Sequence, residues 1–183
     1  FSFQLVSSFM QLFYLQYIGI KASDYAIIIL ISKAFDAVND IVIGNLVDTK
    51  RIGKKSKYMP WILLGGVTLV IFNVMIFAPV QNFPYAAKYA WCLIAYCLWS
   101  IAYTMVNVPY GSLLSLISND VKDRASLSAW RSVGSIFGNM IPMVILPFII
   151  YDKDNNLIGE RVFIAALIMG ALGFICFQFM IRN

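Results

Sequence analysis

The sequence predicts an all-α, polytopic membrane protein, and three observations support this fold class. Hydrophobic residues make up 61% of the 183 amino acids and charged residues only 13%, whereas roughly 25% of the residues in soluble domains are charged. Apolar runs long enough to cross about 30 Å of hydrocarbon recur along the chain. Lysine and arginine collect in the short gaps between these runs, as topology signals of membrane proteins do.

Six apolar runs predict six transmembrane helices. They cover approximately residues 1–18, 24–47, 59–80, 86–116, 126–150 and 160–181. The first run begins at Phe1 with no initiator Met and no polar flank, so we expect it to be the remainder of a longer helix. The chain is therefore expected to be a fragment of a larger protein.

The distribution of basic residues predicts which loops face the cytoplasm. Eight lysines and arginines follow the second, fourth and sixth runs, whereas the alternate gaps hold four. Because basic residues concentrate on the cytoplasmic side of a membrane, we expect a multi-pass protein of the cell membrane. Both ends of this segment and the loops around Lys54 and Lys122 would be cytoplasmic, and the loop around Asp154 external.

Residue usage argues against several functional classes. The chain has no histidine, which excludes histidine-based catalytic triads and histidine metal sites, and its three cysteines lack metal-ligand or redox spacing. The net charge of +5 lies in loops between membrane runs and does not form a nucleic-acid-binding patch. We therefore expect no enzyme, no nucleic-acid partner and no organic cofactor.

The second run contains an intramembrane polar stripe formed by Lys33, Asp36 and Asp40. At 100° per residue the two aspartates lie about 40° apart and Lys33 about 60° from Asp36, so all three share one helix face. Each charge costs about 2.5 to 3.5 kcal/mol at a helix centre, which favours a face turned to the bundle interior. The stripe is either a Lys–Asp lock between helices or an ion site. The second, unpaired carboxylate favours the ion site.

Two further runs carry polar groups inside their spans. In the fourth, Tyr103, Thr104 and Asn107 precede Pro109, which predicts a polar kink, and such kinks are also common as purely structural features. In the fifth, Arg131 lies several residues inside the run. It either extends to the cytoplasmic interface, as long basic side chains do, or serves the function of the protein.

Two long segments resemble signatures of the glycoside–pentoside–hexuronide:cation symporters, the melibiose permease group of the major facilitator superfamily. Residues 35–62, "FDAVNDIVIGNLVDTKRIGKKSKYMPWI", resemble the second-helix signature of that family. Residues 103–131, "YTMVNVPYGSLLSLISNDVKDRASLSAWR", resemble its second signature. The resemblance covers essentially the whole chain and implies the amino-terminal six-helix bundle of a twelve-helix transporter, with a carboxy-terminal six-helix half as its partner.

The resemblance also implies roles for individual residues. The cation-binding residues would be Asp36, Asn39, Asp40 and Thr104, with the two aspartates as candidate Na+ ligands. The substrate-binding residues would be Lys33, Tyr103, Asn107 and Arg131. A cytoplasmic conformational loop would include Gly44, Asp48, Gly53, Lys54 and Lys55. The oxygen donors of the first group suit a hard monovalent cation, and a proton taken up by a carboxylate could serve instead.

The function implied is symport of a sugar or glycoside with Na+ or H+, by alternating access in a lipid bilayer. Two positions depart from the melibiose permease pattern, which has a sugar-binding aspartate at Asn107 and a tryptophan at Gly111. The resemblance therefore does not extend to melibiose as the substrate. Two alternatives stay open: a symporter of a lipid or other non-sugar solute, and a non-transporting membrane scaffold or receptor with the same fold.

Overall fold

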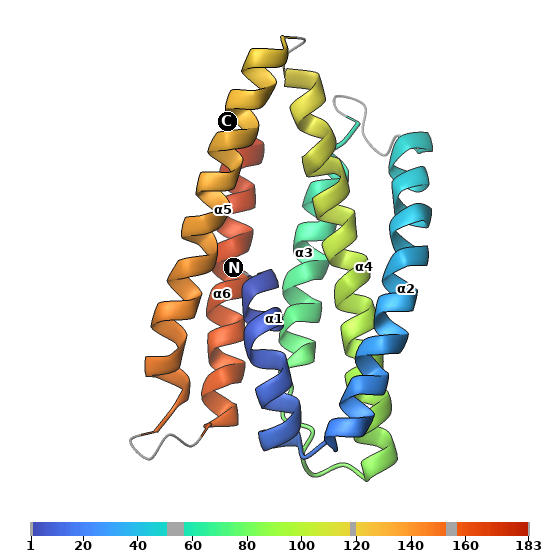
Figure 1. Cartoon of the computed structure of the whole chain (residues 1–183), viewed down its shortest axis with the longest axis vertical. Coiled ribbons are helices and arrows are strands. Elements are labelled where there is room, and N and C mark those ends of the chain that lie inside the picture. The colour runs from blue at the N-terminus through green and yellow to red at the C-terminus, as the bar shows by residue number, and fades with distance from the viewer. Residues whose placement is uncertain (1, 51–56, 118–119, 153–156, 183) are drawn as a thin grey trace.

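The computed structural model describes residues 2–50, 57–117, 120–152 and 157–182 as a bundle of long helices (Figure 1). In chain order the elements are α1 (Ser2–Leu12), the π-helical turn η1 (Phe13–Ile18), α2 (Ala22–Thr49), α3 (Met59–Ile76), α4 (Tyr85–Ile117), α5 (Val121–Ile150) and α6 (Gly159–Arg182). The only strand-like pairing in the described residues is an isolated bridge between Tyr151 and Leu157. The predicted all-α class is therefore confirmed.

Two of the helix bounds differ from those predicted, while the others lie within two residues of the expected positions. The third helix ends at Ile76, not near 80, because Pro79 lacks the N–H that would continue the helix and disfavours helical backbone in the preceding residue. The fifth begins at Val121, not near 126. There Asp120 caps the helix by accepting a 2.9 Å hydrogen bond from the backbone N–H of Lys122.

In the described part of the chain, four helices are long and apolar enough to span a membrane: α3, α4, α5 and α6. Within α2, every 18-residue window holds at least three charged residues, so its crossing depends on neighbours that shield the polar stripe. The described part of the first helix, α1 with η1, ends at Ile18 after 17 residues, 11 in α1 and 6 in η1. Length and composition alone thus identify four of the six predicted spans.

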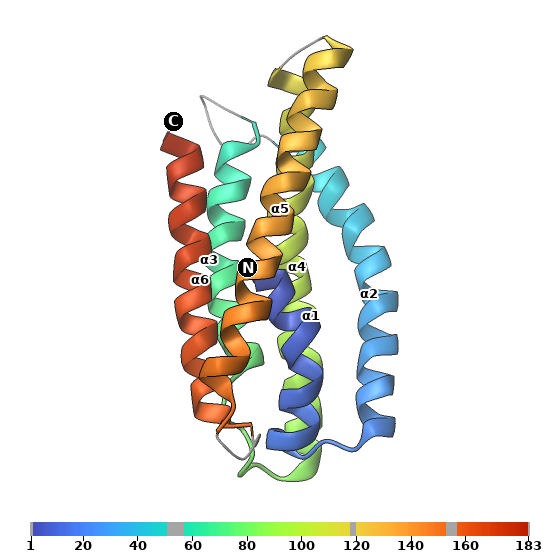
Figure 2. The same cartoon turned by 60° about the vertical axis from the view of Figure 1, so that its left-hand side comes forward.

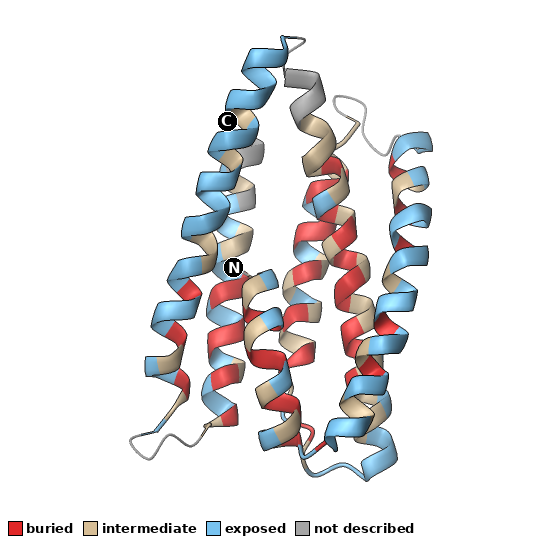
Figure 3. Cartoon of the chain, viewed as in Figure 1, coloured by how far each residue is buried: buried red, intermediate tan, exposed pale blue. Residues whose placement is uncertain are grey.

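The helices α5 and α2 lie at opposite edges of the bundle in Figure 1, and in the turned view of Figure 2 α2 again lies at an edge, opposite α6. The main core is formed by α1, η1, α3, α4 and α6, where Phe13, Tyr14 and Phe77 are fully buried. By contrast, most residues of α5 are exposed, as are many of α2 (Figure 3). Large apolar side chains such as Leu30 and Phe148 lie on these exposed faces, which suits contact with lipid or with further protein segments.

Gly65 permits the close approach of α3 to α4. A Cβ atom at this position would lie 2.8 Å from Val106 Cγ2 and 3.1 Å from the backbone carbonyl carbon of Met105. Small residues at helix crossings allow such contacts in membranes. We therefore expect Gly65→Ala to force α3 and α4 apart.

The expected loss of stability for Gly65→Ala is about 1 to 3 kcal/mol, the usual cost of overpacking. It should appear as a lower melting temperature of the purified full-length protein in detergent. Gly173→Ala on α6 is the control, because nothing lies within 4 Å of its added Cβ. Equal melting temperatures for the two variants would show that the α3–α4 contact relaxes without cost.

Candidate functional site

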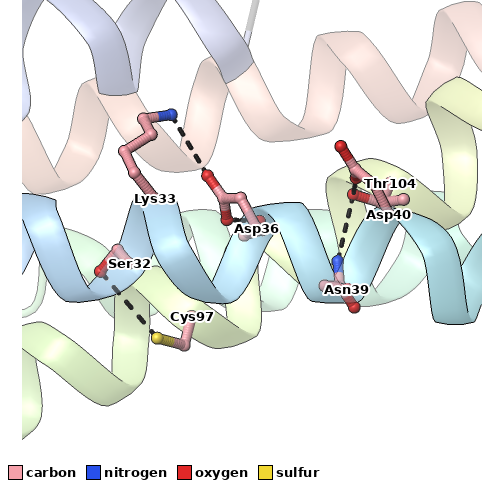
Figure 4. A network of polar contacts seen from close by, with 8 residues as sticks. Ser32, Lys33, Asp36, Asn39, Asp40, Cys97 and Thr104 are labelled. Atoms are coloured by element: carbon pink, nitrogen blue, oxygen red, sulfur yellow. Dashed lines mark hydrogen bonds and ion pairs between the residues drawn. The ribbon is translucent and has the colours of Figure 1, made fainter.

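The polar stripe of α2 lies against α4 and pairs with it at two successive turns (Figure 4). Ser100 Oγ donates a hydrogen bond to Asp36 Oδ1, and Thr104 Oγ1 donates one to Asp40 Oδ1 over 2.8 Å. The partners of each pair are 64 residues apart in sequence, because α2 and α4 run in the same direction. Two hydroxyl groups of α4 thus meet two carboxylates of α2 in register.

Asn39 joins the second of these pairs. Its Nδ2 donates to Thr104 Oγ1 over 3.2 Å, and both side chains are buried between the helices. The Thr104 hydroxyl therefore accepts from an amide while it donates to a carboxylate. All four residues predicted to bind a cation, Asp36, Asn39, Asp40 and Thr104, come together within about two turns of the α2–α4 interface.

Charge along the stripe is unevenly compensated. Lys33 Nζ lies 3.2 Å from Asp36 Oδ2 and 5.9 Å from the ring centroid of Tyr96. Asp40 is exposed and has no ion-pair partner among the described residues. One ammonium against two carboxylates leaves the stripe with a single net negative charge. A Lys–Asp pair is thus present at Asp36, but it lies within α2 and does not itself join two helices, and it leaves Asp40 uncompensated.

No group of three His, Cys, Asp or Glu side chains that could hold a metal gathers in the described part of the chain. A cation between α2 and α4 would therefore be bound by two carboxylates and neutral oxygens. This donor set matches the charge and oxygen preference of a monovalent hard cation.

A cavity of about 1010 Å³ lies on another side of α4, bounded by α3, α5, α6 and the first residues of α1. Three of the predicted substrate residues line it: Tyr103 and Asn107 from α4 and Arg131 from α5. The fourth, Lys33, does not line the cavity and instead contacts Asp36. The carboxylate stripe is also outside the cavity lining.

Aromatic rings and a guanidinium group define the chemistry of this cavity. Arg131 Cζ lies 4.7 Å from the ring centroid of Tyr110, a cation–π distance. The ring of Tyr103 stacks on Phe3 and on Trp99 with centroid separations of 5.3 Å each. Flat aromatic faces beside a positive charge and an amide can bind a small solute that has both an apolar face and hydrogen-bonding groups.

Several cavity residues were not predicted from the sequence. Ser135 and Asn139 lie one and two turns beyond Arg131 on α5 and also line the cavity. Ser135 and Asn139 follow Arg131 by four and eight residues, and this helical spacing is a signal that could have found them. Phe3 had no such signal, because only the fold brings it to Tyr103. Tyr110 lies in the second signature segment, but the resemblance implied no role for it.

The predicted conformational loop is described only in part. Gly44 and Asp48 belong to the last turns of α2, and Lys57 Nζ lies 3.6 Å from Asp48 Oδ1 in an exposed ion pair. Such exposed pairs contribute about 0 to 1 kcal/mol. Gly53, Lys54 and Lys55 lie outside the described residues, so their predicted role is an expectation from the sequence alone.

A multi-helix membrane bundle with an intramembrane charged interface next to a solute-sized cavity has the architecture of a secondary transporter. Comparison with known proteins identifies the family: residues 3–182 match the family model described as MFS/sugar transport protein. The chain therefore belongs to this family of the major facilitator superfamily. The predicted resemblance is confirmed at this level.

Three relatives illustrate the range of the family. An uncharacterized symporter of Bacillus subtilis is 32% identical over 184 residues, covering 100% of this chain and 39% of the relative. A putative glycoside/cation symporter of Escherichia coli is 30% identical over 97% of this chain and 39% of the relative. A sodium-dependent lysophosphatidylcholine symporter of Danio rerio is 30% identical over 73% of this chain and 25% of the relative. The chain thus spans about two fifths of the first two relatives and corresponds to an amino-terminal half.

Proposed function

We propose that the protein containing this chain is a symporter that couples uptake of a sugar or glycoside to entry of Na+ or H+. The observation that supports this most is the double role of α4. Thr104 on this helix hydrogen-bonds Asp40 of the charged stripe, while its neighbours Tyr103 and Asn107 line the cavity. A displacement of α4 would therefore move residues of both the charged stripe and the cavity.

Coupling follows from the charge of the stripe. Asp36 and Asp40 are one turn apart, and Lys33 compensates only Asp36, so the net negative charge disfavours close packing of α2 on α4. A bound monovalent cation removes that charge. If the closer packing favours the substrate-binding arrangement of Tyr103 and Asn107, cation and substrate raise each other's affinity by the same factor.

A sugar or glycoside fits the chemistry of the cavity. Arg131 and Asn107 offer hydrogen bonds to hydroxyl groups, and the Tyr103 and Tyr110 rings offer faces on which a sugar ring can lie. The name of the Escherichia coli relative, a putative glycoside/cation symporter, points to the same substrate class.

A lipid or other non-sugar solute is the second candidate substrate. Many cavity-lining side chains are apolar, among them Leu69, Val106, Leu127 and Met169, and one relative is named a lysophosphatidylcholine symporter. A non-transporting scaffold or receptor is the third possibility, and it predicts no flux of any solute.

Transport in this proposal requires a second six-helix half. Alternating access arises when one half of such a transporter rocks against the other around a site near the middle of the membrane. The exposed faces of α2 and α5 are available for lipid and for that partner half. We accordingly propose a multi-pass plasma-membrane protein whose partners are a small solute, a monovalent cation and the bilayer.

The test is solute flux by the full-length protein in proteoliposomes under imposed Na+ or H+ gradients. Sugars, glycosides and a lysophospholipid would be offered in turn. Gradient-dependent uptake of a sugar or glycoside is the expected result, and the gradient that drives it identifies the cation. Uptake of the lysophospholipid alone would favour the second candidate. Absence of flux for every solute under both gradients would favour the scaffold.

Topology is a separate prediction, based on the eight-to-four distribution of basic residues. Single cysteines would replace Lys122 or Asp154 in the full-length protein after removal of its native cysteines. On intact cells, an impermeant thiol reagent should label the cysteine at 154 and should reach the one at 122 only after permeabilisation. The opposite labelling pattern would reverse the proposed orientation.

A further inference from the structure

Ser100 uses its hydroxyl group differently from several other helical serines and threonines among the described residues. Hydroxyl groups inside helices often donate to the carbonyl four residues earlier, and the hydroxyls of Thr68, Ser112 and Ser132 all do so. Ser100 and Thr104 instead donate across the interface to the two carboxylates of α2. The hydroxyls of Ser2 and Ser32 also reach another helix, where they contact Asn73 and Cys97. Ser100 and Thr104 differ from them because their partners are carboxylates.

The Ser100 side chain is buried in the α2–α4 interface. Its side chain is only 5% exposed, so water does not replace the bond to Asp36 easily. One turn earlier, Ser32 Oγ and Cys97 Sγ lie 4.0 Å apart, which extends the same register between α2 and α4. Ser100 is thus held between two further contacts of the interface, one at Ser32 and one at Asp40.

The two carboxylate oxygens of Asp36 have partners on different helices. Its Oδ1 accepts from Ser100 inside the interface, and its Oδ2 contacts Lys33, whose side chain is 63% exposed. Without the hydroxyl, the attraction of Lys33 would be the main force on the carboxylate and would turn it toward the open face of α2. The Ser100 hydroxyl opposes this rotation and keeps one carboxylate oxygen on the α4 side, one turn from Asp40.

We propose that Ser100 is a positioning residue of a Na+ site between α2 and α4. It holds Asp36 where this carboxylate can contribute to the same ion as Asp40 and Thr104. The inference rests on the proposed cation coupling and goes beyond it, because neither the signature residues nor the sequence pattern selected position 100. Thr104 would contact the ion itself, whereas Ser100 would act through Asp36.

The experiment measures binding of radioactive Na+ to the purified full-length protein, without substrate and at fixed pH. Removing one hydrogen bond to a charged group should weaken Na+ binding by about tenfold in Ser100→Ala. Ser100→Thr keeps the hydroxyl and should bind Na+ within about twofold of the parent protein, the scatter allowed for an unaffected site. The control is Ser132→Ala, which removes a hydroxyl bonded to its own helix and should leave Na+ binding unchanged.

A double-mutant cycle with Lys33 separates positioning from general packing. If Ser100 opposes the attraction of Lys33, then Ser100→Ala should weaken Na+ binding much less in a Lys33→Gln background than in the parent protein. A purely structural role would give the same loss in both backgrounds. Ser100→Cys, which keeps the size and weakens the donor, should bind Na+ with intermediate affinity and replaces Ser100→Ala if that variant does not fold.

The outcomes distinguish the two proposals. Na+ binding that is equal in the parent, Ser100→Ala and Ser100→Cys would overturn the role of Ser100 and leave cation coupling intact. A parent protein that binds no Na+ would overturn the Na+ site and the role of Ser100 together. The proton-gradient arm of the flux experiment would still decide the proposed symport in that case.

Discussion

Asp40→Asn in the full-length protein is expected to abolish the effect of the coupling cation on substrate affinity while substrate binding itself persists. Asp40 is the carboxylate of the stripe with no ion-pair partner among the described residues, and its neutral substitute removes the charge that the cation would compensate. The parent protein should show a coupling of about 1 to 3 kcal/mol, a factor of roughly 5 to 150 in affinity. This factor should fall to about one.

The measurement is calorimetric titration of a transported solute with and without the driving cation. Asp36→Asn provides the comparison, because Lys33 and Ser100 already hold that carboxylate. It should reduce the coupling less completely than Asp40→Asn does. If Asp40→Asn gains substrate affinity on cation addition as the parent does, the stripe is a structural Lys–Asp lock.

Arg131→Ala is expected to weaken substrate binding directly, both with and without the cation. Arg131 lines the cavity and lies over the Tyr110 ring, and the two carboxylates of the stripe are outside the cavity lining. Loss of hydrogen bonds from a charged group costs about 1.5 to 3 kcal/mol, which corresponds to a tenfold to hundredfold loss of affinity. Arg131→Lys should recover only part of this loss, because an ammonium lacks the planar donor arrangement of guanidinium.

Arg161→Ala serves as the matched control, because Arg161 is exposed at the start of α6 and contacts the carbonyl of Ile149 outside the cavity. Titration of the solute into each variant gives the comparison. If Arg131→Ala binds the solute as well as Arg161→Ala does, Arg131 is an interfacial arginine that extends to the membrane surface. Substrate binding in the cavity would then not depend on the guanidinium group of Arg131.

Together the two substitutions separate coupling from affinity. Asp40→Asn should change the dependence on the cation and leave a measurable substrate affinity, whereas Arg131→Ala should lower that affinity and leave the dependence intact. This separation follows from the position of the two residues on different sides of α4. Thr104 faces the stripe and Tyr103 faces the cavity, since consecutive residues of a helix point about 100° apart.

The fold class, the approximate helices and the stripe can all be predicted from the amino-acid sequence. Composition and the lengths of apolar runs predict membrane helices because lipid requires every backbone hydrogen bond to be made within the segment. Helical periodicity placed Lys33, Asp36 and Asp40 on one face. The end of α3 and the start of α5 were predicted less well. A proline determines where α3 ends, and a capping aspartate determines where α5 begins. The hydrophobicity of the sequence does not reveal such local hydrogen bonding.

The ion pairing of the two carboxylates and the set of residues that completes each site depend on how the helices pack against one another. The contacts of Asp36 with Ser100 and of Phe3 with Tyr103 join residues 64 and 100 positions apart. Such contacts depend on the relative rotation and register of two helices. The periodicity of one helix shows which of its residues share a face, but not which face of its neighbour they meet. The carboxylate stripe and the cavity are therefore separated by α4, and the sequence pattern does not predict this separation.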